Sequence, residues 1–398
     1  MRVASFQFQM QWLATVMDQR AAIDRLQLQI STGTRILQPS DDPAAAARVV
    51  ELGSAREAAR QYIENGSVAR ERLASEESLL AQAGNLLQRV RELTVQAANA
   101  TTSVDAKQAI AVEMRQSLQS LLAIANSKDA RGEYVFSGLR STTQAFVGNG
   151  ASVVFAGDDA QRFVRVGPDQ LIADRDSGEQ VFNAIPTGSG LVVARASATN
   201  TGTLLLGARA VVDPVAWDGG SYTVQFVAPD SYEVRDAANA LVQAGAYADG
   251  DQITFRGLSL SLSGMPAAGD SLSAGPSGTQ SVFQTIDRLA QALETATSGP
   301  SAQAATGNVI GDSLEDLDRA LERIGEVRAQ VGGRLQAIEQ SADLMADNSI
   351  SLTAEISGLR DVDLAEALSS LTNLLTGLDA SQQAYTRLQG LSLFNYLR

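Results

Sequence analysis

The segment from Asp361 to Arg398 constrains the fold of this chain more than any other stretch. Its apolar residues recur alternately four and three positions apart, which is the a/d spacing of a helix that packs against another helix. The ladder consists of Leu364, Leu368, Leu371, Leu375, Leu378, Gln382 and Tyr385, and Leu374, Leu388, Leu391, Leu393 and Phe394 widen it. Because an amphipathic helix gains its stability mainly from packing, we expect a partner to cover this one.

The N-terminal residues 1–38 predict a matching amphipathic helix. Its apolar face is formed by Met10, Leu13, Val16, Met17, Ala21, Ile23, Leu26 and Ile30. Gly33 is expected to end this helix, and Asp42 is placed as the N-cap of the next one, with Pro43 at its first position. The simplest way to cover both apolar ends is for them to pair with each other in space.

Further helical patterns lie inward of both ends. The longest runs from Ile310 to Met345 without a break in its four-three spacing. Gly332 and Gly333 lie inside it, where each glycine costs a helix about 1 kcal/mol relative to alanine. We therefore expect either a packed neighbour at this point or a bend.

The middle of the chain has the character of short strands. Segments 152–155 and 162–166 predict a small hairpin around a turn at 156–159. Residues 191–194, 203–206, 221–227, 232–235, 252–255 and 258–262 predict a small β-sandwich or barrel. The expected fold class is α+β, with a long antiparallel coiled-coil bundle and an inserted β domain. We expect three parts: terminal helices (1–42 and 356–398), a helical bundle with the hairpin (43–185 and 276–355) and the β domain (186–275).

Composition excludes several classes of function. The chain of 398 residues has 45 acidic against 31 basic residues, no basic run, no cysteine and no histidine. The net negative charge therefore disfavours nucleic acid as a partner, and the composition excludes catalysis or metal binding by thiolate or imidazole groups. The acidic turns lack the ligand spacing of a calcium loop. No stretch is long enough to span a membrane, and the N-terminus lacks a signal-peptide pattern. We predict no catalytic residue, metal, cofactor or membrane contact.

Two motifs resemble the signatures of a known family, the bacterial flagellins and their relatives at the hook–filament junction. The N-terminal motif is Ile30-Ser-Thr-Gly-Thr-Arg-Ile36 with Ser40-Asp-Asp-Pro-Ala-Ala-Ala46, and the C-terminal one is Leu359-Arg-Asp-Val-Asp-Leu-Ala-Glu366. The resemblance covers residues 1–145 and 280–398. Three segments resemble the junction members rather than the filament subunits: 38–43 with its two prolines, Arg131–Gly138 and Leu391–Leu397. The segment Gly264–Asp270 is also similar to hook-associated proteins.

The resemblance implies a structural role outside the cell, at the hook–filament junction of a flagellum. It implies a ring of identical subunits that contacts hook-associated protein 1 on the hook side and flagellin on the filament side. It also implies export by the flagellar type III apparatus with a chaperone. The expected assembly interface is the apolar face of both ends: Met10, Leu13, Val16, Met17, Ile23, Leu26, Ile30, Leu364, Leu368, Leu371, Leu375, Leu378, Tyr385, Leu388, Leu391 and Phe394.

Two alternatives remain open from the residues. The first is a flagellin filament subunit, which would grow long filaments instead of a limited ring. The second, of another class, is a secreted coiled-coil adhesin or an enzyme-bearing stalk. The adhesin needs terminal helices that are stable alone, whereas an assembly subunit should have ends that proteases trim rapidly. A hydrolase screen of the isolated fragment 186–275 would test the enzyme-bearing stalk.

Overall fold

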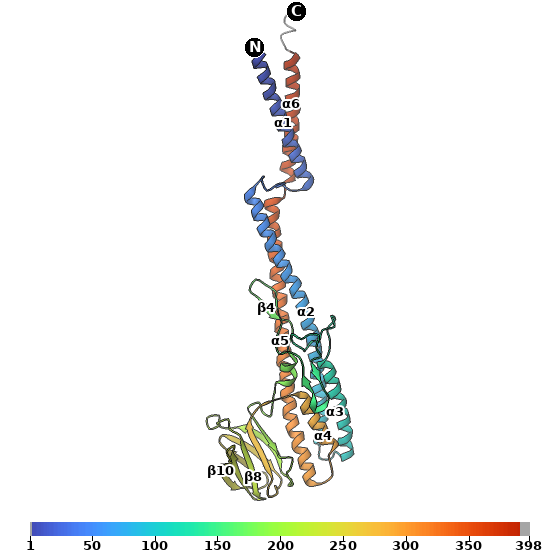
Figure 1. Ribbon diagram of the computed structural model, residues 1–398, viewed down its shortest axis with the longest axis vertical. Coiled ribbons are helices and arrows are strands. Elements are labelled where there is room, and N and C mark those ends of the chain that lie inside the picture. Colours follow the sequence, from blue (N-terminus) through green and yellow to red (C-terminus); the bar gives the residue numbers. More distant parts are fainter. Residues whose placement is uncertain (1, 391–398) are drawn as a thin grey trace, which may run out of the picture. The chain divides into compact units, whose positions relative to one another are not determined.

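Long helices occupy both ends of the chain, and short strands occupy its middle (Figure 1). The structure is a computed structural model that describes the backbone of residues 2–390; the side chains of residues 2–5, 8, 151 and 388–390 are outside the description. The helices are α1 (Arg2–Thr32), α2 (Pro43–Ala98), α3 (Val104–Ala125), α4 (Val282–Glu294), α5 (Pro300–Arg360) and α6 (Leu364–Gly390). This arrangement confirms the α+β fold class.

The chain divides into two compact units. Residues up to 64 and from 341 onward form one, which we call the terminal unit, and residues 65–340 form the other, which we call the body unit. Helices α2 and α5 contribute residues to both. The finer three-part division expected from the sequence stays a prediction.

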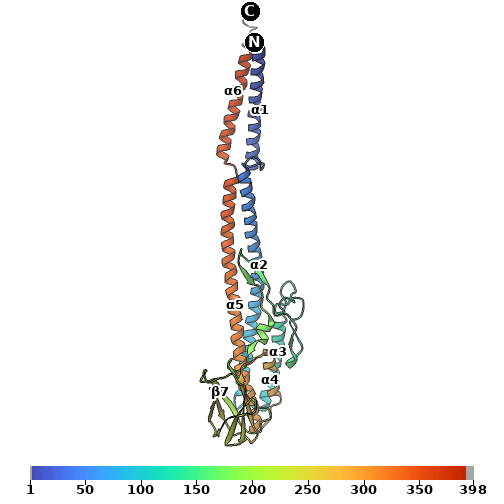
Figure 2. The same cartoon turned by 60° about the vertical axis from the view of Figure 1, so that its left-hand side comes forward.

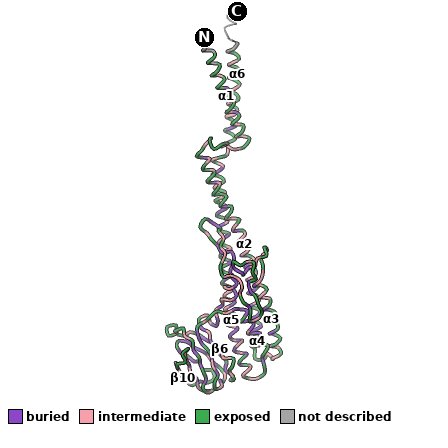
Figure 3. Tube along the Cα trace, viewed as in Figure 1, coloured by how far each residue is buried: buried purple, intermediate pink, exposed green. Residues whose placement is uncertain are grey.

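Helices α1 and α6 lie side by side in the terminal unit (Figures 1 and 2). This confirms that the two ends of the chain pair in space. Most of their residues are nevertheless exposed (Figure 3), because two helices can cover only one face of each other.

In the body unit, α2, α3, α4 and α5 pack around one apolar core. Every third or fourth residue of α2 from Ala69 to Ala97 is buried, the spacing of a helix that packs along its whole length. Small helical and strand segments close this core with an aromatic cluster. Its members are Phe136, Phe146, Phe155, Phe182 and Phe283.

The inserted β region consists of two antiparallel sheets around a second core, which confirms a small β-sandwich. The five-stranded sheet has the order β10-β9-β8-β13-β6, and the three-stranded sheet has the order β11-β12-β7. The strands are β6 (Val192–Ala196), β7 (Leu205–Val211), β8 (Tyr222–Ala228), β9 (Ser231–Asp236), β10 (Leu241–Ala246), β11 (Gln252–Phe255), β12 (Leu258–Ser263) and β13 (Ser271–Pro276). Two of them, β10 and β13, are not predicted by the sequence patterns.

The prediction of a small hairpin from segments 152–155 and 162–166 is wrong, because these two segments do not pair with each other. Instead β2 (Val154–Phe155) pairs with β1 (Phe146–Val147), and β3 (Phe163–Arg165) pairs with β4 (Leu171–Ala173). Each partner strand has only two or three residues, too few for alternation to be recognisable. Two further short strands, β5 (Ile185–Pro186) and β14 (Thr279–Gln280), pair where the chain enters and leaves the sandwich.

Buried charges fix the sandwich to helix α5 within the body unit. The Arg209 guanidinium, on β7, lies 2.7 Å from the Asp312 carboxylate and also donates to the carbonyl of Ala194. Asn308 accepts from the backbone N–H of Leu206 at 2.8 Å and donates to the carbonyl of Leu204 at 2.8 Å. These hydrogen bonds and the ion pair satisfy buried polar groups on both elements, and they hold the sandwich against α5.

A buried carboxyl group occupies a core position of α2. Glu76 lies between Leu73 and Leu80 in the buried ladder and is fully enclosed. One of its oxygens accepts the backbone N–H of Asp176 at 3.1 Å, and the other has no hydrogen-bond partner among the described residues. Burial, together with repulsion from Asp176, raises the pKa of the Glu76 carboxyl well above its usual range.

Helix α5 continues through Gly332 and Gly333 without interruption. No atom lies within 4 Å of a Cβ built on either residue, and neither has a left-handed backbone. The two glycines therefore lie on the open face of α5, whereas the opposite face is packed as expected, with Val331 fully buried in the body core.

Candidate assembly interface

Helix α1 carries two apolar ladders rather than the single face expected from its sequence. Both have the four-three spacing, but they are offset around the helix by roughly 130° at 100° per residue. The first ladder consists of Trp12, Val16, Gln19, Ile23, Leu26 and Ile30, and the second of Phe6, Met10, Leu13 and Met17.

The first ladder packs against α6. Val16 and Ile23 are buried, and the Trp12 ring stacks on the Tyr385 ring with centroids 3.8 Å apart. The indole N–H of Trp12 also donates to the Ser381 hydroxyl at 3.1 Å. On α6 the corresponding ladder runs from Ala367, which is buried, through Leu371, Leu374 and Leu378 to Tyr385.

The second ladder remains exposed after this pairing. Val16 has 6% of its surface exposed, whereas its neighbour Met17 has 59%. Phe6, Met10 and Leu13 are exposed as well. An exposed row of large apolar residues on a helix marks a surface for another protein chain rather than for water.

The predicted interface residues therefore fall into three groups. The first group is buried or half-buried in the terminal unit and consists of Val16, Ile23, Leu26, Ile30, Leu371, Leu378 and Tyr385. The second group is exposed and consists of Met10, Leu13, Met17, Leu364, Leu368 and Leu375. The side chain of Leu388, and Leu391 and Phe394 altogether, lie outside the described residues. Trp12 and Phe6 were missed by the sequence reasoning, which merged the two ladders; sorting the apolar positions by helical angle would have separated them.

The two signature motifs of the sequence meet where the four helix ends of the terminal unit come together. Thr34 forms an isolated antiparallel bridge with Asp361, and the Arg35 N–H donates to the carbonyl of Arg360 at 2.7 Å. The Arg35 side chain donates to the carbonyl of Leu359 at 2.8 Å. Arg35 thus satisfies two carbonyls that would otherwise be unpaired at the C-terminus of α5.

We call the loops at residues 33–42 and 361–363, where these helix ends meet, the joint. Two adjacent carboxylates order its N-terminal loop. Asp42 caps α2, as predicted, by accepting the N–H of Ala45 at 3.0 Å. Asp41 is not a cap: it accepts the N–H groups of Leu37 and Gln38 and lies 2.7 Å from the Arg25 guanidinium. These backbone hydrogen bonds, that of Gln38 foremost, lower the pKa of Asp41. Asp41 and Asp42 therefore hold the loop between α1 and α2 rather than forming a catalytic pair.

The joint is completed by a turn between α5 and α6. Gly33, which ends α1 with a left-handed φ of +70°, accepts the N–H of Val362 at 3.0 Å. Asp363 caps α6 by accepting the N–H of Ala365 at 2.9 Å. The N-terminal and C-terminal motifs are thus hydrogen-bonded to each other through the backbone.

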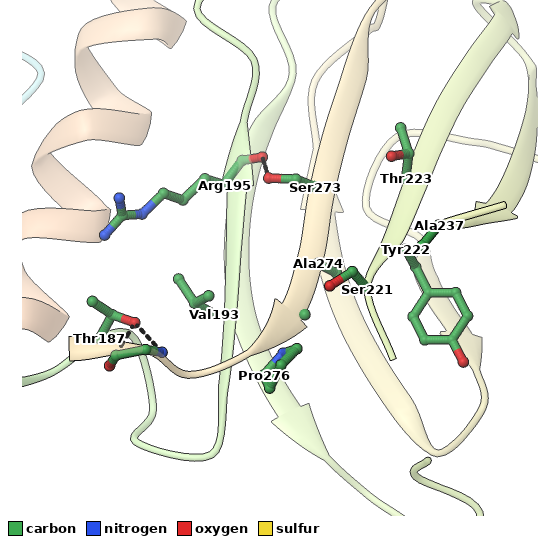
Figure 4. Close-up of a pocket in the computed structure, with 12 residues that line it drawn as sticks. Thr187, Val193, Arg195, Ser221, Tyr222, Thr223, Ala237, Ser273, Ala274 and Pro276 are labelled. Carbon is green, nitrogen blue, oxygen red and sulfur yellow. Dashed lines mark hydrogen bonds between the residues drawn. The ribbon is translucent and has the colours of Figure 1, made fainter. Parts of the chain in front are cut away.

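The body unit also contains concave surfaces. The one in Figure 4 has a volume of about 470 Å³ and is lined mainly by small and hydroxyl residues of β6, β8 and β13. Its charged side chain, Arg195, extends away from the sheet toward a helix (Figure 4) and lies 3.2 Å from the Asp316 carboxylate. In the described part of the chain, no three acidic residues converge in a way that could hold a metal ion. No helix between residues 2 and 390 is long and apolar enough to cross a membrane.

The fold and its paired ends are those of a flagellin-type assembly subunit. The family model of the bacterial flagellin N-terminal helical region matches residues 3–141, and that of the bacterial flagellin C-terminal helical region matches residues 314–397. The chain belongs to the bacterial flagellin family.

Within this family the chain is similar to a flagellar hook-associated protein and to flagellar proteins named FlgL. Flagellar hook-associated protein 3 of Escherichia coli is 25% identical over 367 residues, which cover 92% of this chain and 90% of that protein. The crystal structure of FlgL from Xanthomonas campestris is 40% identical, has a TM-score of 0.72 and covers 76% of this chain and 98% of its own. The flagellar junction protein FlgL from Legionella pneumophila is 31% identical, has a TM-score of 0.71 and covers 79% of this chain and 100% of its own.

Proposed function

We propose that this chain is a structural junction protein of the bacterial flagellum, which connects the hook-side junction ring to the flagellin filament. The observation that carries this proposal is the exposed ladder of α1, from Phe6 to Met17, which stays uncovered although α1 is already paired with α6. A subunit whose paired ends remain apolar on the outside is suited to pack against further subunits. The similarity to hook-associated protein 3 over most of the chain supports the junction rather than the filament.

The proposal includes specific partners. These are other copies of this chain in a ring, hook-associated protein 1 on the hook side and flagellin on the filament side. An export chaperone and the flagellar type III apparatus would bring the chain to its place outside the cell. The formal charge of −14 argues against nucleic acid as a partner.

We also propose that the chain has no enzymatic activity. Its relatives named above are structural flagellar proteins. The residues that line the concavity of Figure 4 include neither a nucleophile paired with a base nor a pair of carboxylates.

The test separates the two ladders of α1 in a strain that lacks this protein. The variant Met10→Ser with Met17→Ser interrupts the exposed ladder at two of its four positions, and we expect loss of motility with flagellin released into the medium. The matched control is Gln11→Ser, an exposed position on the same helix that belongs to neither ladder. It should swim normally.

A second measurement shows that the variant still has paired ends. In a Trp217→Phe background, Trp12 is the only tryptophan, and its fluorescence reports the stacking on Tyr385. We expect this signal to be unchanged in the Met10→Ser, Met17→Ser variant. Normal motility of that variant would contradict the proposal, and growth of long filaments from purified, seeded subunits would favour a flagellin instead.

A further inference from the structure

Glycine directly follows an asparagine or aspartate at several points of the body unit. These dipeptides are Asn65-Gly66, Asn149-Gly150, Asp218-Gly219 and Asp249-Gly250. They can undergo a reaction that needs no enzyme: the backbone nitrogen of the glycine attacks the side-chain carbonyl carbon of the residue before it and closes a five-membered succinimide ring. Glycine favours this attack, because it has no Cβ and lets the backbone turn. The fold then decides which dipeptide can react, since the two atoms must be free to approach each other.

The two Asp-Gly dipeptides lie in ordered turns of the sandwich. The Asp218 carboxylate accepts the Tyr222 hydroxyl at 2.5 Å and the N–H of Gly220 at 2.9 Å. The Asp249 carboxylate accepts the N–H of Gly264 at 2.6 Å. The hydrogen bond from Tyr222, foremost, lowers the pKa of the Asp218 carboxyl. An ionised carboxylate that is held in this way is not attacked by an amide nitrogen.

Asn65-Gly66 is held as well, because it lies inside helix α2. The N–H of Gly66 belongs to the hydrogen-bond ladder of the helix, and the Asn65 side-chain amide donates to the carbonyl of Arg165 at 3.0 Å. Gly66 is buried and faces α5, where a Cβ built on it would lie 3.3 Å from Cγ2 of Ile338. Ring closure at Asn65 therefore requires local unfolding of α2.

Asn149-Gly150 differs from the other dipeptides on each of these points. Asn149 is an exposed residue of the loop between β1 and β2, and its backbone is extended. Its side-chain oxygen caps no backbone N–H of the turn that follows, and the Ser152 hydroxyl lies 3.3 Å from it, beyond the usual range of such a bond. The N–H of Gly150 donates to no acceptor among the described residues. Neither of the two atoms that would join is therefore held in place.

We propose that Asn149 is a site of spontaneous deamidation. The Gly150 nitrogen forms a bond to Cγ of Asn149, the bond from Cγ to the side-chain nitrogen breaks, and that nitrogen leaves as ammonia with the proton of the Gly150 N–H. Water then opens the ring at either of its carbonyl groups, which gives aspartate or isoaspartate at position 149. Water is the only co-reactant, so the modified fraction increases with the age of each molecule.

The isoaspartate product should disturb the β1–β2 hairpin, because it inserts an extra carbon into the backbone. The loop has little room for it, since a Cβ built on Gly150 would lie 2.7 Å from the Asp287 carboxylate. Strand β1 precedes the loop and holds Phe146, which is fully buried and donates its N–H to Oδ1 of Asn126 at 2.9 Å. We therefore expect isoaspartate to loosen β1 more than aspartate does.

Mass spectrometry of the purified full chain tests the site. After incubation at mildly alkaline pH, trypsin releases peptides 61–70 and 141–162, in which Asn65 and Asn149 are the sole asparagines. We expect deamidation of Asn149 to be at least about tenfold faster than that of Asn65, because Asn65 can react only from locally unfolded α2. In urea neither residue is held, and the two rates should become similar.

The matched control is Asn149→Gln, whose longer side chain would have to close a six-membered ring, a much slower reaction. Peptide 141–162 of this variant should stay unmodified. Equal rates at Asn65 and Asn149 in the folded chain would overturn the proposal, and so would a chain in which Asn149 reacts only after urea is added. These outcomes leave the proposed function untouched, because the measurement needs no flagellum.

Hydrogen exchange measures the effect on β1. After the same incubation, the amides around Phe146 should exchange faster in the natural chain than in Asn149→Gln. The variant Asn149→Asp carries the new charge without the extra backbone carbon, and its exchange should resemble that of Asn149→Gln. Unchanged exchange in a chain that contains isoaspartate would overturn the expected loosening of β1.

Discussion

The rings of Trp12 and Tyr385 stack with centroids 3.8 Å apart and planes within 9° of each other, although the two residues lie near opposite ends of the chain. The hydrogen bond from the Trp12 indole to the Ser381 hydroxyl fixes the same point of the α1–α6 pair. The two terminal helices of one subunit therefore contact each other. The surface available to other subunits is the part of α1 and α6 that this pairing does not cover.

The aromatic stack should contribute a measurable coupling energy. In a double-mutant cycle of Trp12→Leu and Tyr385→Leu, we expect about 0.5–1.5 kcal/mol of coupling beyond additivity, the usual value for an aromatic pair. Hydrogen exchange of the α1 amides measures the opening free energy of the pair. The control cycle uses Phe6→Leu with Tyr385→Leu, because Phe6 lies on the exposed ladder. Additive effects at Trp12 and Tyr385 would show that the stack does not hold the ends together.

Two glycines that share a left-handed backbone should respond differently to alanine. A Cβ at Gly138, which has φ +64°, would lie 1.8 Å from the carbonyl oxygen of Asp158, whereas one at Gly132, with φ +80°, would meet nothing within 4 Å. We expect Gly132→Ala to lower the free energy of unfolding by about 1–2 kcal/mol through backbone strain alone. Gly138→Ala should cost about 3–5 kcal/mol, because the clash involves backbone that cannot move aside. Urea unfolding measures both, and equal losses would contradict the packing at Gly138.

The ion pair between Arg209 and Asp312 should be costly to break from one side. Arg209→Met leaves the Asp312 carboxylate buried without its partner, and we expect a loss of about 3–5 kcal/mol in the free energy of unfolding. The double variant Arg209→Met with Asp312→Leu should recover part of that loss, because the more buried carboxylate is gone and Glu315, the other partner of Arg209, is 33% exposed. The control is Arg235→Met: its pair with Glu233 is partly exposed, and it should change stability by about 0–1 kcal/mol. A double variant as unstable as the single one would show that packing, not charge, explains the effect.

Glu76 should make the stability of the body unit depend on pH. Burial, together with repulsion from Asp176, raises the pKa of this carboxyl in the folded state well above the ordinary value of 4.5. The folded state therefore favours the neutral acid, so the contribution of Glu76 is fully present below about pH 4.5 and is lost as pH rises through the raised pKa. Glu76→Gln keeps the acceptor for the Asp176 N–H but does not titrate.

The free energy of unfolding should therefore rise for Glu76→Gln relative to the natural chain as pH increases from 4 toward 8. Chemical unfolding at several pH values measures the difference. The control Glu71→Gln, at an exposed position of the same helix, should show no such trend. A constant difference between Glu76→Gln and the natural chain over this range would mean that Glu76 does not titrate with folding.

Local sequence signals predicted the end of α1 and the start of α2 correctly. Gly33 ends α1 and Asp42 caps α2 because backbone conformation and capping depend on a few neighbouring residues. The strands with clean alternation, such as β8 and β12, were found for the same reason. By contrast β13, with the sequence Ser-Leu-Ser-Ala-Gly-Pro, has no recognisable pattern; it is a strand because β8 and β6 supply hydrogen-bond partners on both of its sides.

The sequence by itself determined that both ends of this chain carry apolar helical ladders and that something must cover them. Only the tertiary structure decided that Val16 faces α6 while Met17 faces outward, since the rotation of α1 about its axis depends on how its side chains pack against a distant partner. The same holds for Glu76, whose burial in the α2 ladder depends on a loop that lies far away in the sequence. Periodicity follows from the covalent chain, but the choice of which face is covered belongs to the fold.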